Sequence, residues 1–155
     1  GMAVAGIVGA GLFKSARLKV SNGVHVNTTK DGNVIMYHGT TNPATIKRAQ
    51  FLDPRFATAT FGAQGLFVSP EKGVAQTYAN TISKNGATKK GIVIKVEVPR
   101  KEFDKWLAKK RGEEQYINQQ IKSGSYTADE IENLKMEREL LYSEMGTHEK
   151  LKIIR

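Results

Sequence analysis

The chain lacks cysteine and is poor in several other residue types on which common folds and sites depend. Its 155 residues include no cysteine, 4 prolines, one tryptophan and 3 histidines. Without cysteine, a disulfide framework, a thiolate metal site and a cysteine nucleophile are all excluded. His25, His38 and His148 are too widely separated in the sequence to form a local zinc-binding cluster.

Long hydrophobic runs are also missing. The longest apolar tract, residues 3–13, is interrupted by glycines and is too short for a transmembrane helix, so we expect no membrane partner. Its basic residues follow it rather than precede it, unlike those of a signal peptide. We therefore expect residues 1–12 to be a flexible linker remnant and residues 13–155 to form a single domain.

Acidic residues are few compared with basic ones. The chain has 24 Lys and Arg against 15 Asp and Glu, a net charge of +9. Residues 84–111 contain ten basic and three acidic side chains, whereas residues 112–149 contain three basic and nine acidic ones. This excess of positive charge favours a polyanionic or acidic partner through long-range electrostatic attraction.

Hydrophobic periodicity predicts strands and helices that do not strictly alternate, which is typical of the α+β class. Residues 91–98 alternate as a half-buried strand does, and Thr127 to Glu130 spell a capping box that opens a helix. Residues 53–64 show no hydrophobic periodicity, which predicts a long loop. Residues 20–26, interrupted by Asn22-Gly23, are expected to form a short strand or a hairpin. We expect strands at 34–37, 65–69, 91–98, 140–142 and 151–154, and helices at 42–50, 70–82, 101–110, 116–121 and from 127 onward.

Three segments carry residues suited to chemistry. Residues 37–40, Tyr-His-Gly-Thr, stand where a predicted strand ends and offer an imidazole, an unhindered backbone and a hydroxyl. Residues 65–69 form a predicted strand that leads into a helix bearing Tyr78. Glu139 begins the predicted strand that includes residues 140–142. Together, the three segments suggest one composite site.

In kind and order, these segments resemble those of the His-Tyr-Glu branch of the ADP-ribosyltransferases, which includes diphtheria toxin and the poly(ADP-ribose) polymerases. Residues 38–40 resemble the family's His-Gly-Ser/Thr element, and the thirteen positions from Gly65 to Tyr78 match its glycine-strand-helix-tyrosine segment. Residues 139–142 resemble its closing glutamate-strand. The resemblance spans residues 34–155. It implies the ADP-ribosyltransferase fold, a split pair of small, mostly antiparallel β-sheets with flanking helices and NAD⁺ in the cleft between them.

The resemblance also implies roles for individual residues. Glu139 would stabilise the positive charge that builds on the ribose when nicotinamide leaves, a charge that is greatest in the transition state. Aromatic faces suit the planar, cationic nicotinamide. The implied catalytic residues are Glu139, His38 and Tyr78. The implied NAD⁺-binding residues are His38, Gly39, Thr40, Phe67, Tyr78 and Tyr37. This chemistry needs no metal.

The chain departs from the family pattern at three positions. Phe67 stands where the family has a second tyrosine, which keeps an aromatic wall but loses a hydroxyl. Ala75 stands where polymerase-type members have a serine, as in diphtheria-like members. Glu137 and Glu139 resemble the Glu-x-Glu of the separate Arg-Ser-Glu branch, in which the first acid orients the acceptor. Which branch's rule applies is left open by the sequence.

Each residue also has an ordinary structural interpretation. Tyr78 on an inward helix face would usually be a core residue. Glu139 would be one acid among nine that balance the basic half, and His38 a hydrogen-bonding residue at a strand end. Their joint occurrence in the family's order favours the functional interpretation.

The expected function is therefore transfer of ADP-ribose from NAD⁺ to a macromolecule. The basic segment slightly favours structured RNA over protein as acceptor, with Lys105, Lys109 and Arg111 as acceptor-binding residues and Glu137 as an orienting acid. By analogy, we expect a toxin domain of a secreted or translocated bacterial effector that acts in the cytoplasm of a target cell and has an acidic immunity protein as partner. The alternatives are an NAD⁺ glycohydrolase and a noncatalytic, basic RNA-binding module.

Overall fold

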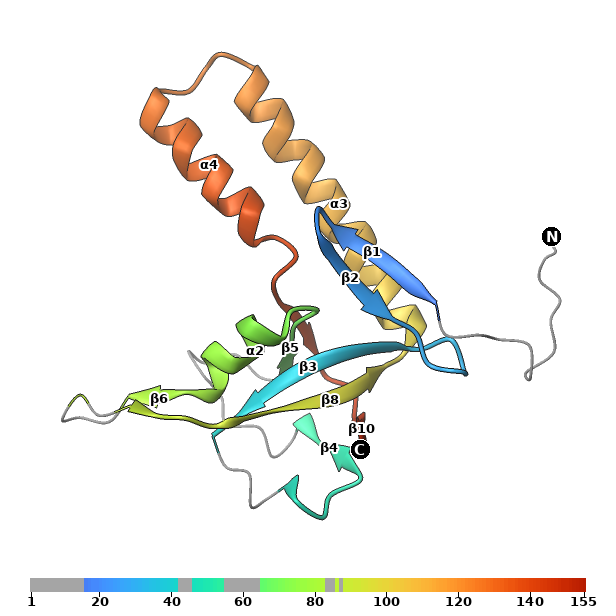
Figure 1. Cartoon of the computed structure of the whole chain (residues 1–155). Helices are drawn as coiled ribbons and strands as arrows, with labels where there is room; N and C mark the ends of the chain where they lie inside the picture. The colour runs from blue at the N-terminus through green and yellow to red at the C-terminus, as the bar shows by residue number, and fades with distance from the viewer. Residues whose placement is uncertain (1–15, 42–45, 55–64, 83–85, 87) are drawn as a thin grey trace, which may run out of the picture.

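The computed structural model describes residues 16–41, 46–54, 65–82, 86 and 88–155 (Figure 1). In chain order, the elements are β1 (Arg17–Ser21), β2 (Val24–Asn27), β3 (Val34–Thr40), β4 (Phe51–Leu52), β5 (Leu66–Val68), α2 (Lys72–Ala79), β6 (Thr81–Ile82), β7 (Thr88–Lys89), β8 (Ile92–Val98), α3 (Arg100–Lys122), α4 (Ala128–Leu140), β9 (Met145–Thr147) and β10 (Leu151–Ile154). The expected linker, residues 1–12, and most of the expected 53–64 loop lie outside the described residues.

The strands form small antiparallel sheets. β3, β8, β10 and β4 make a four-stranded sheet in that order, and β5 pairs with β9. β1–β2 and β6–β7 are two-stranded. The α+β class with small antiparallel sheets is thereby confirmed. The predicted hairpin around Gly23 and the predicted strands at 91–98 and 151–154 are present as well.

The four-stranded sheet and the β5–β9 sheet meet at one bridge. The Tyr37 amide donates to the Ser69 carbonyl and the Ser69 amide donates to the Tyr37 carbonyl, both at 2.8 Å. β3 is also longer than expected, because it continues through Thr40 instead of ending at Tyr37. The bridge therefore places the second half of β3 beside the end of β5.

α2 lies close against the ends of β3 and β8. A Cβ atom at Gly39 would come within 2.0 Å of the Ala75 carbonyl oxygen, and one at Gly91 within 2.2 Å of the Ala79 carbonyl oxygen. Ala75 and Ala79 are the buried residues of this helix. A glycine on β3, a glycine just before β8 and two alanines on the helix thus allow the close packing that fixes α2 beside the bridge.

A helical hairpin, α3 and α4, is inserted between β8 and β9 and extends away from the sheets (Figure 1). Two separate helices were predicted at 101–110 and 116–121, but α3 is one helix of 23 residues. Gly112 lowers helix stability by about 1 kcal/mol relative to alanine, which is too little to break the helix. Burial of Trp106 before it and Ile117 after it offsets that cost.

Three other predictions are wrong at element boundaries. The strand predicted at 140–142 does not form, because Leu140 ends α4 and Tyr142 is buried in the following turn. The helix predicted at 42–50 does not continue past Ile46, and the Arg155 guanidinium donates to the Ile46 and Ala49 carbonyls there; residues 42–45 lie outside the described part. The helix predicted at 70–82 is shorter, with α2 running from Lys72 to Ala79.

Candidate functional site

His38 is held on β3 by the backbone of β5. Its Nδ1 lies 2.8 Å from the Phe67 carbonyl oxygen. A carbonyl oxygen only accepts, so Nδ1 carries the hydrogen, and in the neutral ring Nε2 keeps a free electron pair. Burial lowers the pKa of His38, and the opposing bond to Phe67 is the smaller influence. At neutral pH the imidazole is therefore uncharged and presents Nε2 as an acceptor for a hydroxyl group.

Gly39 has a packing role that the sequence did not indicate. We expected its missing side chain to leave room for a ligand, but that space is filled by the backbone of α2. Its amide and carbonyl point to the same strand edge as those of Tyr37, because alternate residues of a strand share an edge. This is the edge on which Tyr37 bonds to Ser69, at the junction of the sheets. Only the backbone polar groups of Gly39 are therefore directed to the candidate site.

Tyr37 and Thr40 lie on opposite faces of β3. Side chains alternate along a strand, so Tyr37 shares the face of Gly39, which α2 covers, whereas Thr40 shares the face of His38. Of the two, Thr40 is the one whose side chain is on the same face as the candidate imidazole.

Tyr78 is not a core residue. Its side chain is 50% exposed, while Ala75 and Ala79 take the buried face of α2. The phenol donates a hydrogen bond to the Glu144 carboxylate. This bond is the main reason why the pKa of Tyr78 is raised to about 12, with burial and the charge of Glu144 adding to it. A half-exposed tyrosine bonded to a carboxylate has the character of a site residue.

The carboxylate that Tyr78 contacts belongs to Glu144, five residues after the predicted Glu139. Glu139 is exposed near the end of α4. The capping box at Thr127 is formed as predicted, and the helix that it opens runs for 13 residues, through Glu139. Glu144 immediately precedes β9, the strand that pairs with β5. Glu139 was predicted to begin a strand at 140–142, but the strand that follows α4 is β9, and Glu144 is the glutamate that precedes it.

Phe67 links His38 to the start of β9. It pairs with Gly146 on β9, and a Cβ atom there would lie 3.4 Å from the Phe67 ring. Gly65, just before β5, has a φ of +114°, and a Cβ atom on it would come within 2.8 Å of the Thr147 carbonyl oxygen. The glycine in the predicted motif is thus required where β5 and β9 approach each other.

These contacts bring residues from four segments into one constellation. His38 bonds to the Phe67 backbone, the Phe67 ring lies over Gly146, and Glu144 accepts the bond from Tyr78. An imidazole, a carboxylate and two aromatic rings are thus connected through β3, β5 and β9, with the His38 side chain on the face of β3 opposite to the one that α2 covers. Such a set can hold a hydroxylated, cationic, aromatic ligand and stabilise positive charge on it.

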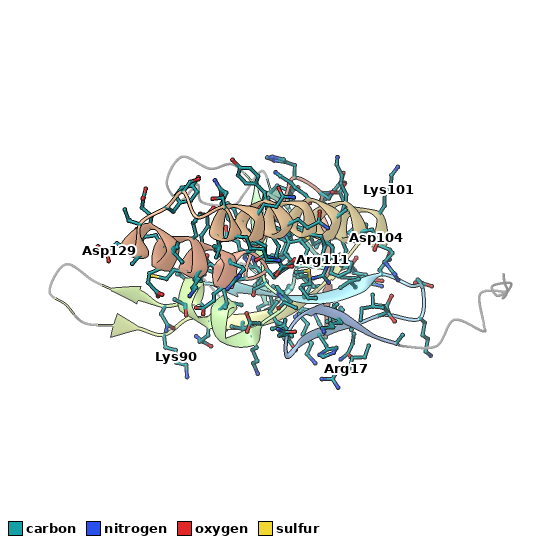
Figure 2. All side chains as sticks on the ribbon, turned by 90° about the horizontal axis from the view of Figure 1, so that it is seen from above. Arg17, Lys90, Lys101, Asp104, Arg111 and Asp129 are labelled. Atoms are coloured by element: carbon teal, nitrogen blue, oxygen red, sulfur yellow. The ribbon has the colours of Figure 1, made fainter. Side chains whose placement is uncertain are left out.

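The expected acceptor residues lie on the helical hairpin, but not on one face of it. Lys105 and Lys109 are exposed on α3, one helical turn apart. Lys101 continues this row, a position that the sequence analysis missed although its spacing of four residues was visible. Arg111 instead lies over the Tyr142 ring, 5.0 Å from its centre, on the side of α3 that faces the strands (Figure 2).

Glu137 lies on the helical hairpin as well. With Lys109 and Tyr116 it helps to line a hollow of about 430 Å³ between α3 and α4. None of the lining residues belongs to the junction of the sheets. The hollow is therefore separate from the His38 constellation, and Glu137 does not take part in that constellation.

Among the residues that the structure describes, no group of three or more His, Asp or Glu side chains could hold a metal ion. In the same residues, no helix is long and apolar enough to cross a membrane. A scan against protein-family models, a search of curated proteins and a search of solved structures each found no match. Functional inference therefore depends on the geometry of the site and on the three sequence segments.

Proposed function

We propose that this chain is an NAD⁺-dependent ADP-ribosyltransferase in which Glu144 takes the role that the sequence suggested for Glu139. The observation that carries the proposal is the hydrogen bond from Tyr78 to Glu144 at the junction of the sheets. It joins a helix that follows β5 to the residue that precedes β9, beside the strand that carries His38. The bond thus links the tyrosine of one predicted segment to a glutamate near the predicted closing strand, and the Tyr37–Ser69 bridge joins their strands to the strand of His38, which supports the proposal.

The reaction breaks the bond between C1′ of the ribose and the nicotinamide nitrogen. The electron pair of that bond goes to the nicotinamide ring, which becomes neutral, and positive charge builds on the ribose. The Glu144 carboxylate stabilises that charge, and more strongly in the transition state than in bound NAD⁺. An oxygen or nitrogen atom of the acceptor then bonds to C1′ and loses its proton.

The remaining residues of the constellation bind the substrate. Nε2 of His38 accepts a hydrogen bond from a ribose hydroxyl, and the backbone of Gly39 faces the nicotinamide carboxamide. The rings of Tyr78 and Phe67 flank the cationic nicotinamide. To admit the ribose next to Glu144, the phenol of Tyr78 gives up its bond to the carboxylate.

The acceptor binds along α3. Lys101, Lys105 and Lys109 are exposed at intervals of one turn, whereas the neighbouring Arg100 and Lys110 are paired with acids at 2.9 and 3.3 Å. Within the described part of the chain this row of cations has no such pairs, which favours a polyanion, so structured RNA is the preferred acceptor. The same surface suits an acidic partner protein, such as the immunity protein of a translocated toxin domain.

Two matched substitutions test the catalytic assignment. Glu144→Gln keeps the size of the side chain and removes its charge, so release of nicotinamide from labelled NAD⁺ should fall at least about 100-fold. Glu139→Gln makes the same change on the exposed face of α4 and should leave the rate within about twofold. A large loss in Glu139→Gln together with normal turnover in Glu144→Gln would restore the assignment made from the sequence.

The acceptor class is identified in the same assay. Wild-type protein is incubated with NAD⁺ labelled in the adenosine part and a cell lysate, and the product is digested with nuclease or protease. Release of label by nuclease supports an RNA acceptor, and release by protease replaces it with protein. Free ADP-ribose as the only product would make the enzyme a glycohydrolase.

A further inference from the structure

We infer that Trp106 is a positioning residue for Glu144 and that, through it, α3 sets where the carboxylate lies relative to Tyr78. The inference rests on the proposed function for its catalytic meaning, while the contacts themselves come from the structure. The indole N–H of Trp106 donates to the Glu144 backbone carbonyl at 3.1 Å. Because this bond reaches the backbone of Glu144, it fixes the residue without occupying its carboxylate.

Trp106 is itself well anchored. It is 9% exposed, and its ring packs against Phe103 at 5.9 Å between ring centres. A ring packed in this way has few alternative rotamers, so its N–H points in one direction. The indole is therefore a rigid support, and its hydrogen bond transmits the position of α3 to Glu144.

A second set of contacts holds the same segment to α3. The Tyr142 ring meets Trp106 edge-on at 6.3 Å and lies under the Arg111 guanidinium. The Tyr142 hydroxyl donates to Glu114 at 2.9 Å. Trp106, Arg111 and Glu114 of α3 thus all contact Tyr142, which lies two residues before Glu144.

The burial pattern around Glu144 agrees with this arrangement. Leu141, Tyr142 and Met145 are at most 7% exposed, whereas Ser143 and Glu144 are only partly buried. The buried residues on both sides restrict the positions that Ser143 and Glu144 can take. The insertion between β8 and β9 is thus part of the candidate site, because it ends in the segment that carries the carboxylate.

The experiment compares Trp106→Phe with Ile117→Val. The first keeps an aromatic ring but removes the N–H, and the second loosens the same helix at a buried position that takes no part in the hydrogen bonds and ring contacts described above for Tyr142 and Glu144. The readout is the ionisation of Tyr78, followed by NMR of ¹³C-labelled tyrosine and assigned with Tyr78→Phe. It reports whether Glu144 still lies at the phenol and needs no enzymatic activity.

Because the bond to Glu144 raises the pKa of Tyr78 to about 12, we expect about one-tenth of it to be ionised at pH 11 in the wild-type protein. In Trp106→Phe we expect about half ionisation at that pH, and nicotinamide release lowered about tenfold in kcat with KM within about twofold. Ile117→Val should match the wild type in both. Circular dichroism at pH 11 verifies that each protein is folded.

The outcomes separate the inference from the proposed function. Wild-type ionisation of Tyr78 in a folded Trp106→Phe protein overturns the positioning role. If the wild type releases no nicotinamide, the proposed function fails, but the ionisation of Tyr78 still decides whether Trp106 positions Glu144. If Trp106→Phe does not fold, Tyr142→Phe, which removes only the hydroxyl bond to Glu114, tests the same support by the same readout.

Discussion

The helical hairpin α3–α4 and the junction of the sheets are held together by different kinds of interaction. The hairpin is specified largely by residues close in sequence, such as the capping box of Thr127 and Glu130. The junction depends on contacts between distant segments, such as Tyr37 with Ser69 and Tyr78 with Glu144. We therefore expect the hairpin to tolerate single substitutions, whereas the junction forms only when several distant segments pack against one another.

Glycine substitutions should show this difference most strongly. Gly91→Ala places a Cβ atom within 2.2 Å of both the Ala79 and Thr40 carbonyl oxygens, so it should lower the free energy of unfolding by about 2 kcal/mol or more. Gly112→Ala in α3 meets nothing within 4 Å and should raise it by about 0.5–1 kcal/mol. Urea denaturation of both variants measures the contrast. Equal effects on stability would show that the two regions do not differ in this way.

Charge reversal along α3 should separate the acceptor surface from the NAD⁺ site. Replacing Lys101, Lys105 and Lys109 with glutamate should weaken transfer to RNA about tenfold or more, while release of nicotinamide in the absence of acceptor stays within about twofold. If three phosphate contacts are lost, the log-log dependence of RNA binding on salt becomes shallower by about 2 to 3.

The control for charge reversal changes the net charge equally without touching α3. Lys19, Lys30 and Lys152 are exposed on other parts of the chain, and their replacement with glutamate should leave transfer close to wild type. Equal losses in the two triple variants would assign the effect to net charge. If neither triple variant loses transfer to RNA, α3 does not bind the acceptor.

We expect a smaller effect of pH on stability, which arises from His38 at the junction. Burial lowers the pKa of His38 in the folded protein below its ordinary value of 6.5, so folding favours the neutral ring. Its contribution to stability is complete above pH 6.5 and is lost as the pH falls below that value, because the unfolded chain then binds the proton more readily. His38→Asn lacks this dependence. Urea denaturation at pH 7.5 and 5.0 should therefore show a steeper fall in stability for the wild type than for the variant.

Much of the secondary structure could be predicted because its signals are local. Alternation gave the strand that became β8, and Asn22-Gly23 gave the hairpin between β1 and β2. The predicted boundaries of helices and strands were wrong where tertiary contacts decide where an element ends. The Arg155 guanidinium donates to the Ile46 and Ala49 carbonyls in the segment where a longer helix was predicted, and Leu141 and Tyr142 are apolar because they pack in the core after α4, not because they form a strand.

The candidate site divides in the same way. The His-Gly-Thr segment, the glycine-strand-helix-tyrosine segment and a later glutamate are visible in the sequence, because each pattern lies within a short stretch. Which glutamate meets Tyr78 depends on tertiary contacts, since Glu139 and Glu144 are five residues apart and both stand near the end of the helical insertion. The pairing of β9 with β5 and the hydrogen bond from Trp106 select Glu144, and these contacts join segments far apart in the chain.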